Sequence, residues 1–470
     1  MRKRVLLLAA TLTTGLLTAL PVTPATAAPS RLSGDFNGDG YLDIALSAAS
    51  HQVGKAQQAG AVVVLYGSSS GVSAARRTLI TQNSTGVPGT AEAGDLFGES
   101  LAAGDLDGDG YSDLVVGAPN ETIGDRDAVG SATILWGGPS GLSGGALVPQ
   151  PSTLSEWGNF AIGIAIADFD GDGKNDVTLT GRTQTRIYKG PFTRTGTPVS
   201  NLRVGELGTT SNVFAGDLNG DRAAERVYPF TVDGDEGGEI DYFTWTGSQH
   251  VMKELPNADG LPGSIGDING DGYGDVVLGD PTDPGTSKKS GHRGGQISVW
   301  YGGPNGPAPT QTPTVIHQDT TGVPGAGETD DLFGSSVGTG DINGDGYADV
   351  AVGAPGEDLG KAGEAGAVTI LFGSASGLTT KGSKIWTQDT EGVPGGSEAW
   401  DRFGQSVRLI DINKNGKADL VTGAGGENGY GAVTVLRGTA SGLTTDYAKF
   451  ISARDVSVQG IGDFAWAIAQ

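Results

Sequence analysis

The chain has 470 residues, with 54 acidic and 30 basic side chains, a formal net charge of −24, 82 glycines and no cysteine. This charge argues against a nucleic-acid partner, because nucleic-acid binding requires a basic surface. The lack of cysteine excludes disulfides, thiolate metal sites and cysteine nucleophiles.

The N-terminus has the pattern of a secretory signal peptide, which we place at residues 1–28. Basic residues 2–4 precede a mostly apolar stretch over 5–20, and Ala-Thr-Ala at 25–27 offers a cleavage site of small residues. A transmembrane anchor is the alternative, but the apolar stretch is short for a bilayer span. We therefore expect a secreted, extracellular, monomeric protein with no membrane span, whose single mature domain covers residues 29–470.

The main feature of the sequence is a nine-residue acidic segment that occurs seven times, with starts 49 to 74 residues apart. After each segment come a short apolar run, such as DLVVGAP at 113–119, and a second apolar run that ends near a glycine. These runs are typical of β-strands separated by Gly-rich turns. The seven segments are DFNGDGYLD (35–43), DLDGDGYSD (105–113), DFDGDGKND (168–176), DLNGDRAAE (217–225), DINGDGYGD (267–275), DINGDGYAD (341–349) and DINKNGKAD (411–419).

Seven units of about four strands each predict an all-β fold, a seven-bladed β-propeller with calcium-binding β-hairpin loops. A nonapeptide β-helix is the alternative, but it would need a period near nine residues throughout. The first unit lacks the strand that precedes the acidic segment in the other units, and the final segment 462–470 resembles that strand. We therefore predict that the C-terminal strand joins the first blade and closes the ring.

Short motifs on either side of the acidic segments resemble the FG-GAP repeat. Phe97-Gly98 is followed by Gly-Ala-Pro at 117–119, and Phe333-Gly334 by Gly-Ala-Pro at 353–355. Phe403-Gly404 repeats the pattern without the proline. This is the repeat of the propeller in integrin α-subunits and in secreted bacterial proteins, and the resemblance covers essentially all of the mature chain. It implies bound calcium on one face and a ligand-binding, adhesion-type role for the loops of the other.

The acidic segments also have the chemistry of calcium loops on their own terms. Calcium prefers six to eight oxygen ligands at about 2.3–2.6 Å. In the second segment, Asp105, Asp107 and Asp109 at positions 1, 3 and 5 can direct oxygens to one centre, with the carbonyl of Tyr111 at position 7 and Asp113 at position 9. A glycine at position 6 permits the sharp turn. An EF-hand would need Glu at position 12, which is here a strand residue.

The seven loops are not equal in their ligands. The loop at 217–225 has Arg222 at position 6 and ends in Glu225, so we expect a weak or empty site there. The loop at 411–419 has Asn at positions 3 and 5 and includes Lys414, so its site is doubtful. About five sites should be good. The predicted metal ligands are Asp35, Asn37, Asp39, Tyr41, Asp43, Asp105, Asp107, Asp109, Tyr111, Asp113, Asp168, Asp170, Asp172, Lys174, Asp176, Asp267, Asn269, Asp271, Tyr273, Asp275, Asp341, Asn343, Asp345, Tyr347, Asp349, Asp411, Asn413, Asn415, Lys417 and Asp419.

The charge of the chain is concentrated in these segments. They contain 22 acids and 4 bases, a net −18 of the total −24. Because the carboxylates within a loop repel one another, calcium should stabilise the fold. A site with a Kd near 10⁻⁴ M in about 1 mM calcium contributes roughly 1.4 kcal/mol, so five sites would contribute about 7 kcal/mol.

The sequence predicts no catalytic site and no organic cofactor. We expect the four histidines to lie in different units as surface or loop residues, and none forms an HExxH motif. Gly-Ser-Ser-Ser-Gly at 67–71 matches the nucleophile-elbow pattern, but no helix follows it, so we interpret it as a hairpin turn. A hydrolase that uses the propeller as a scaffold is the least favoured function.

Binding therefore remains as the expected function, with an unknown extracellular protein or a glycan as the partner. The candidate binding loops are the long polar segments 81–95, 317–331 and 387–401. A lectin-like or polysaccharide-binding propeller is the alternative to an adhesion-type protein. The basic stretch 284–295 could contact a polyanion, although a solvated loop is favoured.

Three tryptophans bear on the glycan alternative. Trp157, Trp386 and Trp400 could stack on sugars, but we expect them to be buried between blades. Trp136 occupies a strand position that is aromatic in other units, and we interpret it as a packing residue.

Overall fold

The structure is a computed structural model that describes residues 32–204, 212–230, 240–255, 258–284, 291–460 and 462–469. The predicted signal peptide lies outside the described residues, and so does the segment 285–290 of the basic stretch. In the described part, regular structure consists of β-strands and one short 3-10 helix, η1 (Glu427–Gly429). The all-β prediction is therefore confirmed, and no helix of the described residues is long and apolar enough to cross a membrane.

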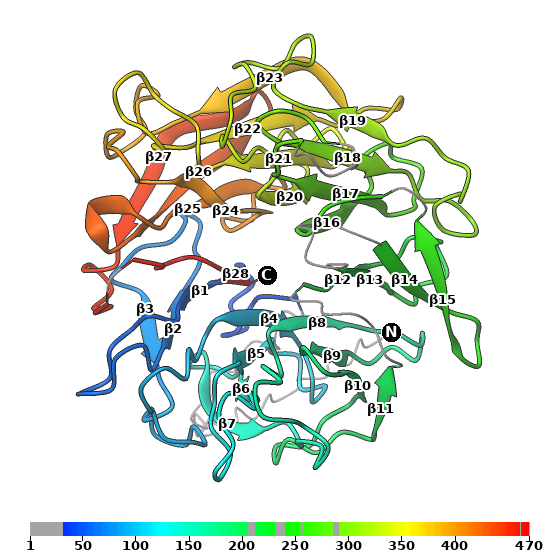
Figure 1. Cartoon of the computed structure of the whole chain (residues 1–470), viewed down its shortest axis with the longest axis vertical. Coiled ribbons are helices and arrows are strands. Elements are labelled where there is room, and N and C mark those ends of the chain that lie inside the picture. Colours follow the sequence, from blue (N-terminus) through cyan, green and yellow to red (C-terminus); the bar gives the residue numbers. More distant parts are fainter. Residues whose placement is uncertain are drawn as a thin grey trace, which may run out of the picture.

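Seven four-stranded antiparallel sheets surround a central axis as the blades of a propeller (Figure 1). From the axis outward, the strands of blades 1 to 4 are β28 (Ile468–Ala469), β1 (Ile44–Ala48), β2 (Ala61–Leu65) and β3 (Arg77–Ile80); β4 (Ser100–Gly104), β5 (Asp113–Ala118), β6 (Ser131–Trp136) and β7 (Ser143–Leu147); β8 (Gly163–Ala167), β9 (Asp176–Thr180), β10 (Thr185–Lys189) and β11 (Ser200–Val204); β12 (Phe214–Gly216), β13 (Glu225–Pro229), β14 (Ile240–Trp245) and β15 (His250–Leu255). Those of blades 5 to 7 are β16 (Gly263–Gly266), β17 (Asp275–Asp280), β18 (Gln296–Trp300) and β19 (Thr314–Ile316); β20 (Ser336–Gly340), β21 (Asp349–Ala354), β22 (Ala367–Phe372) and β23 (Thr379–Trp386); β24 (Phe403–Ile410), β25 (Asp419–Ala424), β26 (Ala432–Thr439) and β27 (Gly442–Ser452).

The C-terminal strand closes the ring, as the sequence predicts. Ala469 and Ile468 of β28 pair with Ala45 and Leu46 of β1, so the innermost strand of blade 1 comes from the other end of the chain. The inner strands contact one another in cyclic order, and β28 lies between β24 and β4 (Figure 1). Blade 7 is also tied to this strand, because Arg408 Nε donates a 3.0 Å hydrogen bond to the carbonyl of Ile468.

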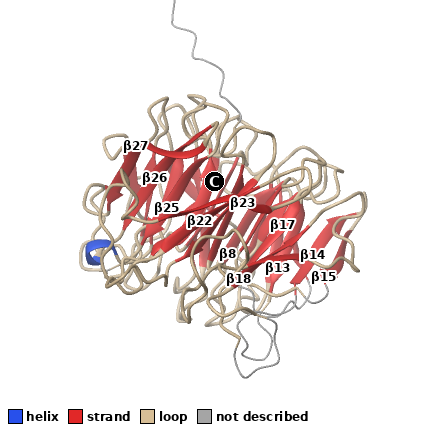
Figure 2. Cartoon of the chain, turned by 90° about the horizontal axis from the view of Figure 1, so that it is seen from above, coloured by secondary structure: helices blue, strands red, loops and turns tan. Residues whose placement is uncertain are grey.

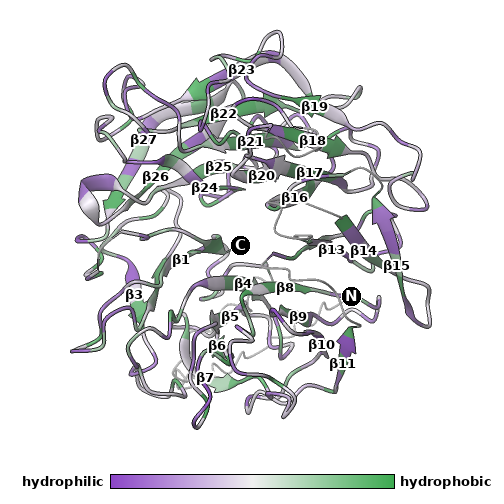
Figure 3. Cartoon of the chain, viewed as in Figure 1, coloured by the Kyte–Doolittle hydropathy of each residue, from purple (hydrophilic) through white to green (hydrophobic). Residues whose placement is uncertain are grey.

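The core lies between neighbouring blades. The second strand of every blade is buried along its whole length, which explains why runs such as that of β5 are apolar on both faces of the sheet. The outer strands face solvent, as β11 does with four exposed residues out of five. The hydropathy colouring shows β11 and β15 as mainly hydrophilic at the rim (Figure 3).

The FG-GAP motif forms a joint between adjacent blades. Phe97 is fully buried and bridges Gly60 of blade 1, while the amide of Gly98 donates a 2.9 Å hydrogen bond to the carbonyl of Gly117. Phe333 and Phe403 make the matching bridges in blades 6 and 7. The motif therefore fixes the turn that leads into each inner strand.

Two blades use a variant of this joint that the motif does not match. Phe160 and Phe464 are as buried as Phe97, but alanine replaces the glycine that follows. Ala161 and Ala465 nevertheless adopt the left-handed conformation of that glycine, with φ of 66° and 64°. The same turn thus forms in blade 3 and at the ring closure with a backbone conformation that alanine rarely adopts.

Candidate metal centre

All seven acidic loops lie on one face of the propeller. In blades 2 to 7 the loop joins the inner strand to the second strand, and in blade 1 it leads directly into β1. Equivalent strands run in the same direction in every blade, so these loops share one face and the FG turns lie on the other. Figure 2 shows the blades from the side, with loops on both faces. We call the two surfaces the acidic face and the FG face.

The first aspartate of each loop organises the backbone. In the second loop, Asp105 Oδ1 accepts a hydrogen bond from the amide of Gly108 at 2.8 Å, and its Oδ2 accepts one from Gly110 at 3.0 Å. Gly108 and Gly110 have φ of 78° and 91°, so positions 4 and 6 are both left-handed. The need for glycine at position 6 was predicted from the sequence, whereas the same need at position 4, where six of the seven loops also have glycine, was not.

The residue at position 9 has a buried carboxylate whose two oxygens accept hydrogen bonds from two different segments. Asp113 is fully buried, and its Oδ2 accepts a 2.9 Å hydrogen bond from the amide of Leu106 at the start of the loop. Its Oδ1 accepts a 2.8 Å hydrogen bond from Gly137, in the turn that follows the third strand. Asp43, Asp176, Asp275 and Asp349 make the same pair of bonds. Position 9 therefore holds the loop against its own blade.

Burial makes these position-9 carboxylates costly to ionise without a cation. Desolvation raises the pKa of Asp113 to about 8 and the pKa of Asp43 to about 7. It also raises the pKa of Asp349 to about 7 and the pKa of Asp275 to about 6. The other carboxylates of the loops raise these pKa values further, and the two backbone hydrogen bonds oppose the change. A divalent cation would remove the cost of the charge.

Carboxylates converge where the sequence predicts metal ligands. Asp105, Asp107 and Asp113 each place an oxygen within 4.8 Å of the others, and the equivalent residues of the third loop do the same. Positions 1, 3 and 9 thus come together. The other five loops have Asn at position 3, and in four of them its Oδ1 accepts a hydrogen bond from the amide at position 5; these asparagines are Asn37, Asn219, Asn269 and Asn343.

The residues at positions 5 and 7 are coupled to each other. Asp109 Oδ1 accepts a 3.0 Å hydrogen bond from the amide of Tyr111, and all seven loops have this contact. The position-7 residue is a predicted metal ligand through its backbone carbonyl. Its side chain takes no part in binding and can therefore be Tyr or Lys. The second oxygen of the position-5 carboxylate pairs with a basic side chain from outside the nonapeptide in the first three loops. In the loops at 267–275 and 341–349 it instead accepts a hydrogen bond from the position-3 asparagine.

Two basic side chains from downstream segments contact the second and third loops. Arg194 forms ion pairs with Asp107 and Asp109, and it comes from the connection between β10 and β11. Lys189, at the end of β10, pairs with Asp170 and with Asp172. Nothing in the nonapeptide pattern indicates these cations, because they lie 17 to 87 residues away in sequence from the carboxylates they contact. They neutralise positions 3 and 5 in the two loops where three carboxylates converge.

The two loops that we expect to be poor sites share one feature. In the loop at 217–225, Asn219 Nδ2 donates a 2.6 Å hydrogen bond to Glu225 Oε1. In the loop at 411–419, Asn413 Nδ2 donates to both oxygens of Asp419, at 2.9 and 2.7 Å. The amide nitrogen therefore lies against the position-9 carboxylate, where a cation would need an oxygen. Arg222 and Lys414 are also left-handed without being glycine, with φ of 76° and 59°.

The donor set fits a hard cation. In the five loops without this feature, the side-chain ligands at positions 1, 3, 5 and 9 are all carboxylate or amide oxygens, which calcium prefers. The buried position-9 carboxylate supplies negative charge that the protein alone leaves poorly compensated. The residues present therefore suit calcium.

The repeat is recognised by comparison with known families. The FG-GAP repeat matches residues 32–65, 97–135, 333–371 and 403–436, and an FG-GAP-like repeat matches 168–228. The chain is an integrin-like FG-GAP β-propeller. Both the motif prediction and the predicted ring of seven blades are thereby confirmed.

Curated relatives of this propeller include integrin α-subunits. Integrin alpha-8 of Mus musculus is 30% identical over 235 residues, which cover 48% of this chain and 20% of the relative. Integrin alpha-6 of Homo sapiens is 33% identical over 186 residues, covering 38% and 14%. A phosphatidylinositol-glycan-specific phospholipase D of Bos taurus is 30% identical over 209 residues, covering 43% and 23%. The chain thus spans less than a quarter of the length of these relatives.

Solved structures with a similar course of the chain are more distant. The rhamnogalacturonan lyase YesX has a TM-score of 0.42 at 13% identity, covering 88% of this chain and 72% of the lyase. A lectin of Agrocybe aegerita that recognises non-reducing terminal N-acetylglucosamine has a TM-score of 0.40 at 16% identity, covering 75% of this chain and 83% of the lectin. Likeness at this level carries no argument about function.

The tryptophan predictions are confirmed in part. Trp136 and Trp386 are buried, with 5% and 7% of their surface exposed. The expectation of burial is wrong for Trp157 and Trp400, which are 61% and 58% exposed. Each stands three residues before the Phe of an FG-type turn and has a left-handed φ, of 59° and 73°.

Proposed function

We propose that this chain is a secreted calcium-binding propeller that acts as a non-catalytic extracellular binding or adhesion-type protein. The observation that carries the calcium assignment is the convergence of Asp105, Asp107 and Asp113 in a loop whose pattern recurs around a closed ring. In this proposal residues 1–28 are the signal peptide and residues 29–470 the mature propeller. Calcium is structural, since it would neutralise buried carboxylates that also hold the loops in place.

The binding role rests on the FG face. The long segments 81–95, 317–331 and 387–401 connect the outer strand of one blade to the inner strand of the next, so all three lie on this face. They share an internal design, because Gln82, Gln318 and Gln388 each donate a hydrogen bond to a glutamate of the following blade. Rigid loops that differ in exposed residues suit recognition of one partner over an asymmetric surface.

A glycan partner is the second candidate, and the exposed tryptophans favour it. The amides of Trp157 and Trp400 make equivalent 2.9 Å hydrogen bonds, to the carbonyls of Asp127 and Gly363. Two blades therefore present an indole at the same place on the FG face. Exposed indoles can stack on the apolar faces of sugar rings, because the ring system is large and polar only at its edge.

A glycan array probed with the calcium-loaded protein, with an EDTA-treated sample beside it, tests the choice between these partners. Calcium-dependent capture of one sugar class that falls at least tenfold in Trp157→Ala and Trp400→Ala would establish the glycan candidate. Tyr447→Ala is the matched control, because Tyr447 is 66% exposed on the outer strand β27. No capture on the array, together with calcium-dependent retention of an extracellular protein by the immobilised propeller, would support the adhesion-type role.

Catalysis is tested with the same sample. Turnover of a phosphatidylinositol-glycan or pectic substrate by the purified chain would overturn the non-catalytic assignment. Calcium content is measured separately: a metal-free protein after dialysis against calcium, with an unchanged melting temperature in EDTA, would contradict the calcium assignment without deciding the partner.

A further inference from the structure

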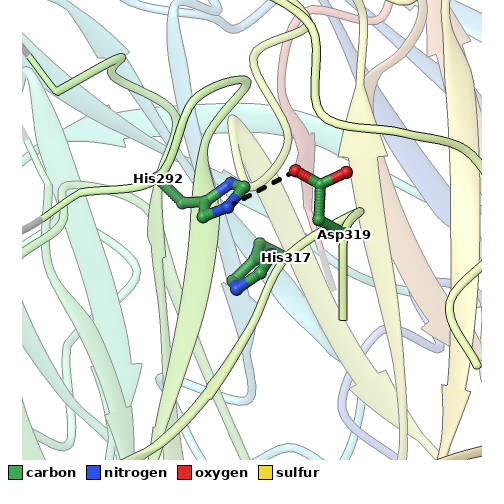
Figure 4. A group of neighbouring side chains, drawn as sticks. All are labelled: His292, His317 and Asp319. Atoms are coloured by element: carbon green, nitrogen blue, oxygen red, sulfur yellow. Dashed lines mark ion pairs between the residues drawn. The ribbon is translucent and has the colours of Figure 1, made fainter. Parts of the chain in front are cut away.

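A third cluster of potential metal ligands lies away from the acidic loops, on the FG face. His292 belongs to the connection between β17 and β18, while His317 and Asp319 follow β19 directly. One ligand atom from each lies within 4.8 Å of the other two (Figure 4). The expectation that the four histidines lie in different units is wrong for this pair, since both belong to blade 5 and their rings stack with centroids 3.5 Å apart.

The cluster consists of a borderline-soft donor set rather than a calcium set. Two imidazoles and one carboxylate are the ligand types that Zn²⁺ and related divalent transition metals take in proteins, whereas calcium takes oxygens. From the geometry we infer that His292, His317 and Asp319 form a site for a divalent transition metal, with Zn²⁺ as the best match. The site is separate from the calcium loops, and the inference does not depend on the proposed function.

The tautomer of His292 leaves its Nε2 as the nitrogen that can bind a metal. Its Nδ1 lies 2.9 Å from the carbonyl oxygen of Arg293, and a carbonyl only accepts, so Nδ1 carries a hydrogen. In the neutral ring the Nε2 lone pair is then directed outward, toward Asp319 Oδ2 at 3.5 Å. A backbone carbonyl on the far ring nitrogen is the usual support of a metal-binding histidine.

The separation of these two atoms suits a shared metal. At 3.5 Å, Nε2 and Oδ2 are beyond a good hydrogen bond. Two ligands bound at about 2.0–2.1 Å in a tetrahedral site lie roughly 3.3 Å apart. The contact is therefore close to the spacing of two ligands around one zinc ion.

His317 has a buried nitrogen without a partner. Its Nδ1 is inaccessible to solvent and makes no hydrogen bond to any described group. The two rings are stacked, with centroids 3.5 Å apart and planes inclined by only 7°, so one ring must turn away from the other before both can bind a single ion.

The two carboxylate oxygens of Asp319 have different contacts. Its Oδ1 accepts a 3.1 Å hydrogen bond from the amide of Gly327. Asn83 and Asp389 make the same bond in their loops, to the amides of Ala91 and Ser397. This bond therefore belongs to the scaffold, and Oδ2 of Asp319 is left for the cluster.

The features specific to this cluster are absent from the equivalent segments 81–95 and 387–401, which we call the sister loops. His317 corresponds to Thr81 and Thr387, which precede the same Gln and the same tight turn. Gly327 replaces the alanine and serine of the other loops, and an added Cβ there would lie 3.2 Å from Asp319 Oδ2 and 3.4 Å from His292 Cε1. The loop thus has both additional ligands and the room they need.

Three protein ligands leave a coordination position open. The side chains of His292 and Asp319 are 27% and 49% exposed, so water or an exogenous ligand can reach the metal from solvent. A closed structural zinc site would have four protein ligands, which the described residues here do not supply.

Titration with Co²⁺ and Zn²⁺ tests the inference on the full chain in excess calcium, which competes with both metals for the acidic loops. We expect one Co²⁺ with the intense visible absorption of a tetrahedral, nitrogen-ligated site, displaced by one Zn²⁺. His317→Thr and His292→Gln should each weaken Zn²⁺ binding more than tenfold, and Asp319→Asn should weaken it while keeping the loop bond to Gly327. His250→Gln, on β15 of blade 4, is the control that removes one histidine and should change nothing.

Each variant introduces a residue that is found at the equivalent position of another blade. Threonine is found at 81 and 387, which correspond to 317, and asparagine at 83, which corresponds to 319. Gln57 stands three residues before the bridging glycine of blade 1, as His292 does in blade 5. Unchanged melting temperatures in calcium confirm that they fold. Zn²⁺ binding that is equal in wild type and the His292→Gln/His317→Thr double variant would overturn the inference. A wild-type chain that takes up no Co²⁺ would also overturn the inference. The contact of His292 with Asp319 would then be an ordinary ion pair.

Discussion

The hydroxyl of Ser100 in blade 2 donates a 2.6 Å hydrogen bond to the carbonyl of Ala161 in blade 3. Ser336 and Ser406 make the same bond to the next blade, at 2.7 and 2.5 Å. Beside each serine lies a glycine of the GAP motif; an added Cβ at Gly117 would lie 2.3 Å from the carbonyl oxygen of Ala161. The FG-GAP motif therefore encodes close approach between blades.

Removing either partner of this joint should destabilise the propeller. Ser100→Ala leaves a buried carbonyl without its donor and should lower the free energy of unfolding by about 1–3 kcal/mol. Gly117→Ala should cost at least as much, because backbone must move to admit the methyl group. Gly138→Ala is the control, since nothing lies within 4 Å of its added Cβ. Urea unfolding in saturating calcium measures all three, and an equal effect of Gly138→Ala would contradict the explanation.

Calcium stoichiometry should distinguish the loops. We expect about five bound ions per chain, and Asp107→Ala should remove one, because it takes a converging oxygen from the second loop. Asp221→Ala in the loop at 217–225 should remove none, since Asn219 already directs its nitrogen at Glu225 there. Equilibrium dialysis with metal analysis counts the ions. A loss of one ion in Asp221→Ala would show that this loop binds calcium after all.

Arg194 should compete with calcium for the second loop. Its guanidinium pairs with Asp107 and Asp109, so a bound cation would meet a positive charge at that point. Arg194→Ala should therefore tighten calcium binding at one site by a few-fold, by removing the repulsion in a largely solvated setting. Arg203→Ala, on the neighbouring strand β11, controls for the change in net charge. Calcium titration calorimetry gives the site constants; weaker binding in Arg194→Ala would mean that the arginine orders the loop instead.

The fold was predictable because its signals are local and repeated. Seven acidic segments with flanking apolar runs indicate the blades, and the lack of a first inner strand indicates the closure by residues 462–470. The special turns are also local, since a left-handed position next to Asp calls for glycine. The calcium ligands themselves stay a prediction that the geometry of Asp105, Asp107 and Asp113 supports.

What the sequence did not predict depends on contacts between distant segments. Arg194 reaches Asp109 from 85 residues away, and no pattern within the nonapeptide marks that approach. His292 and His317 come together because two loops meet on the FG face, although their replacement of residues common to the sister loops was a signal that could have been used. Trp157 and Trp400 are exposed where each precedes an FG-type turn, and no periodicity in the sequence marks their side chains as exposed rather than buried.

Stability should fall with rising pH because of a buried glutamate outside the calcium loops. Burial raises the pKa of Glu121 to about 7, against the opposing effect of a 2.6 Å hydrogen bond from Gln82. Between about pH 4.5 and 7 the folded state then binds more protons than the unfolded state, so the free energy of unfolding decreases as pH rises through this window. Glu121→Gln should flatten this dependence and gain stability relative to wild type at pH 8.

The measurement is urea unfolding at pH 5 and pH 8 with calcium in excess. Glu156→Gln, at an exposed position, should keep the wild-type difference between the two pH values. An identical pH dependence in Glu121→Gln and wild type would assign the effect to other groups, such as Asp331, whose pKa burial also raises to about 7.

The C-terminal segment should stabilise the ring as a whole, because it supplies the inner strand of blade 1. Phe464 is fully buried, and the amide of Ala465 donates a 2.8 Å hydrogen bond to the carbonyl of Ser47. Phe464→Ala should lower the free energy of unfolding by about 3–5 kcal/mol, from lost burial and the cavity it leaves. Trp466→Ala is the control two residues away, and should cost far less because Trp466 is 48% exposed.

Truncation after residue 461 extends this test from packing to closure. It removes β28, and with it the pairing to β1 and the hydrogen bond that Arg408 donates to Ile468. Blades 1 and 7 then lose their shared strand, so we expect earlier urea unfolding and rapid proteolysis near both ends of the chain. A truncated chain that unfolds at the wild-type urea concentration would show that packing between the blades closes the ring without the C-terminal strand.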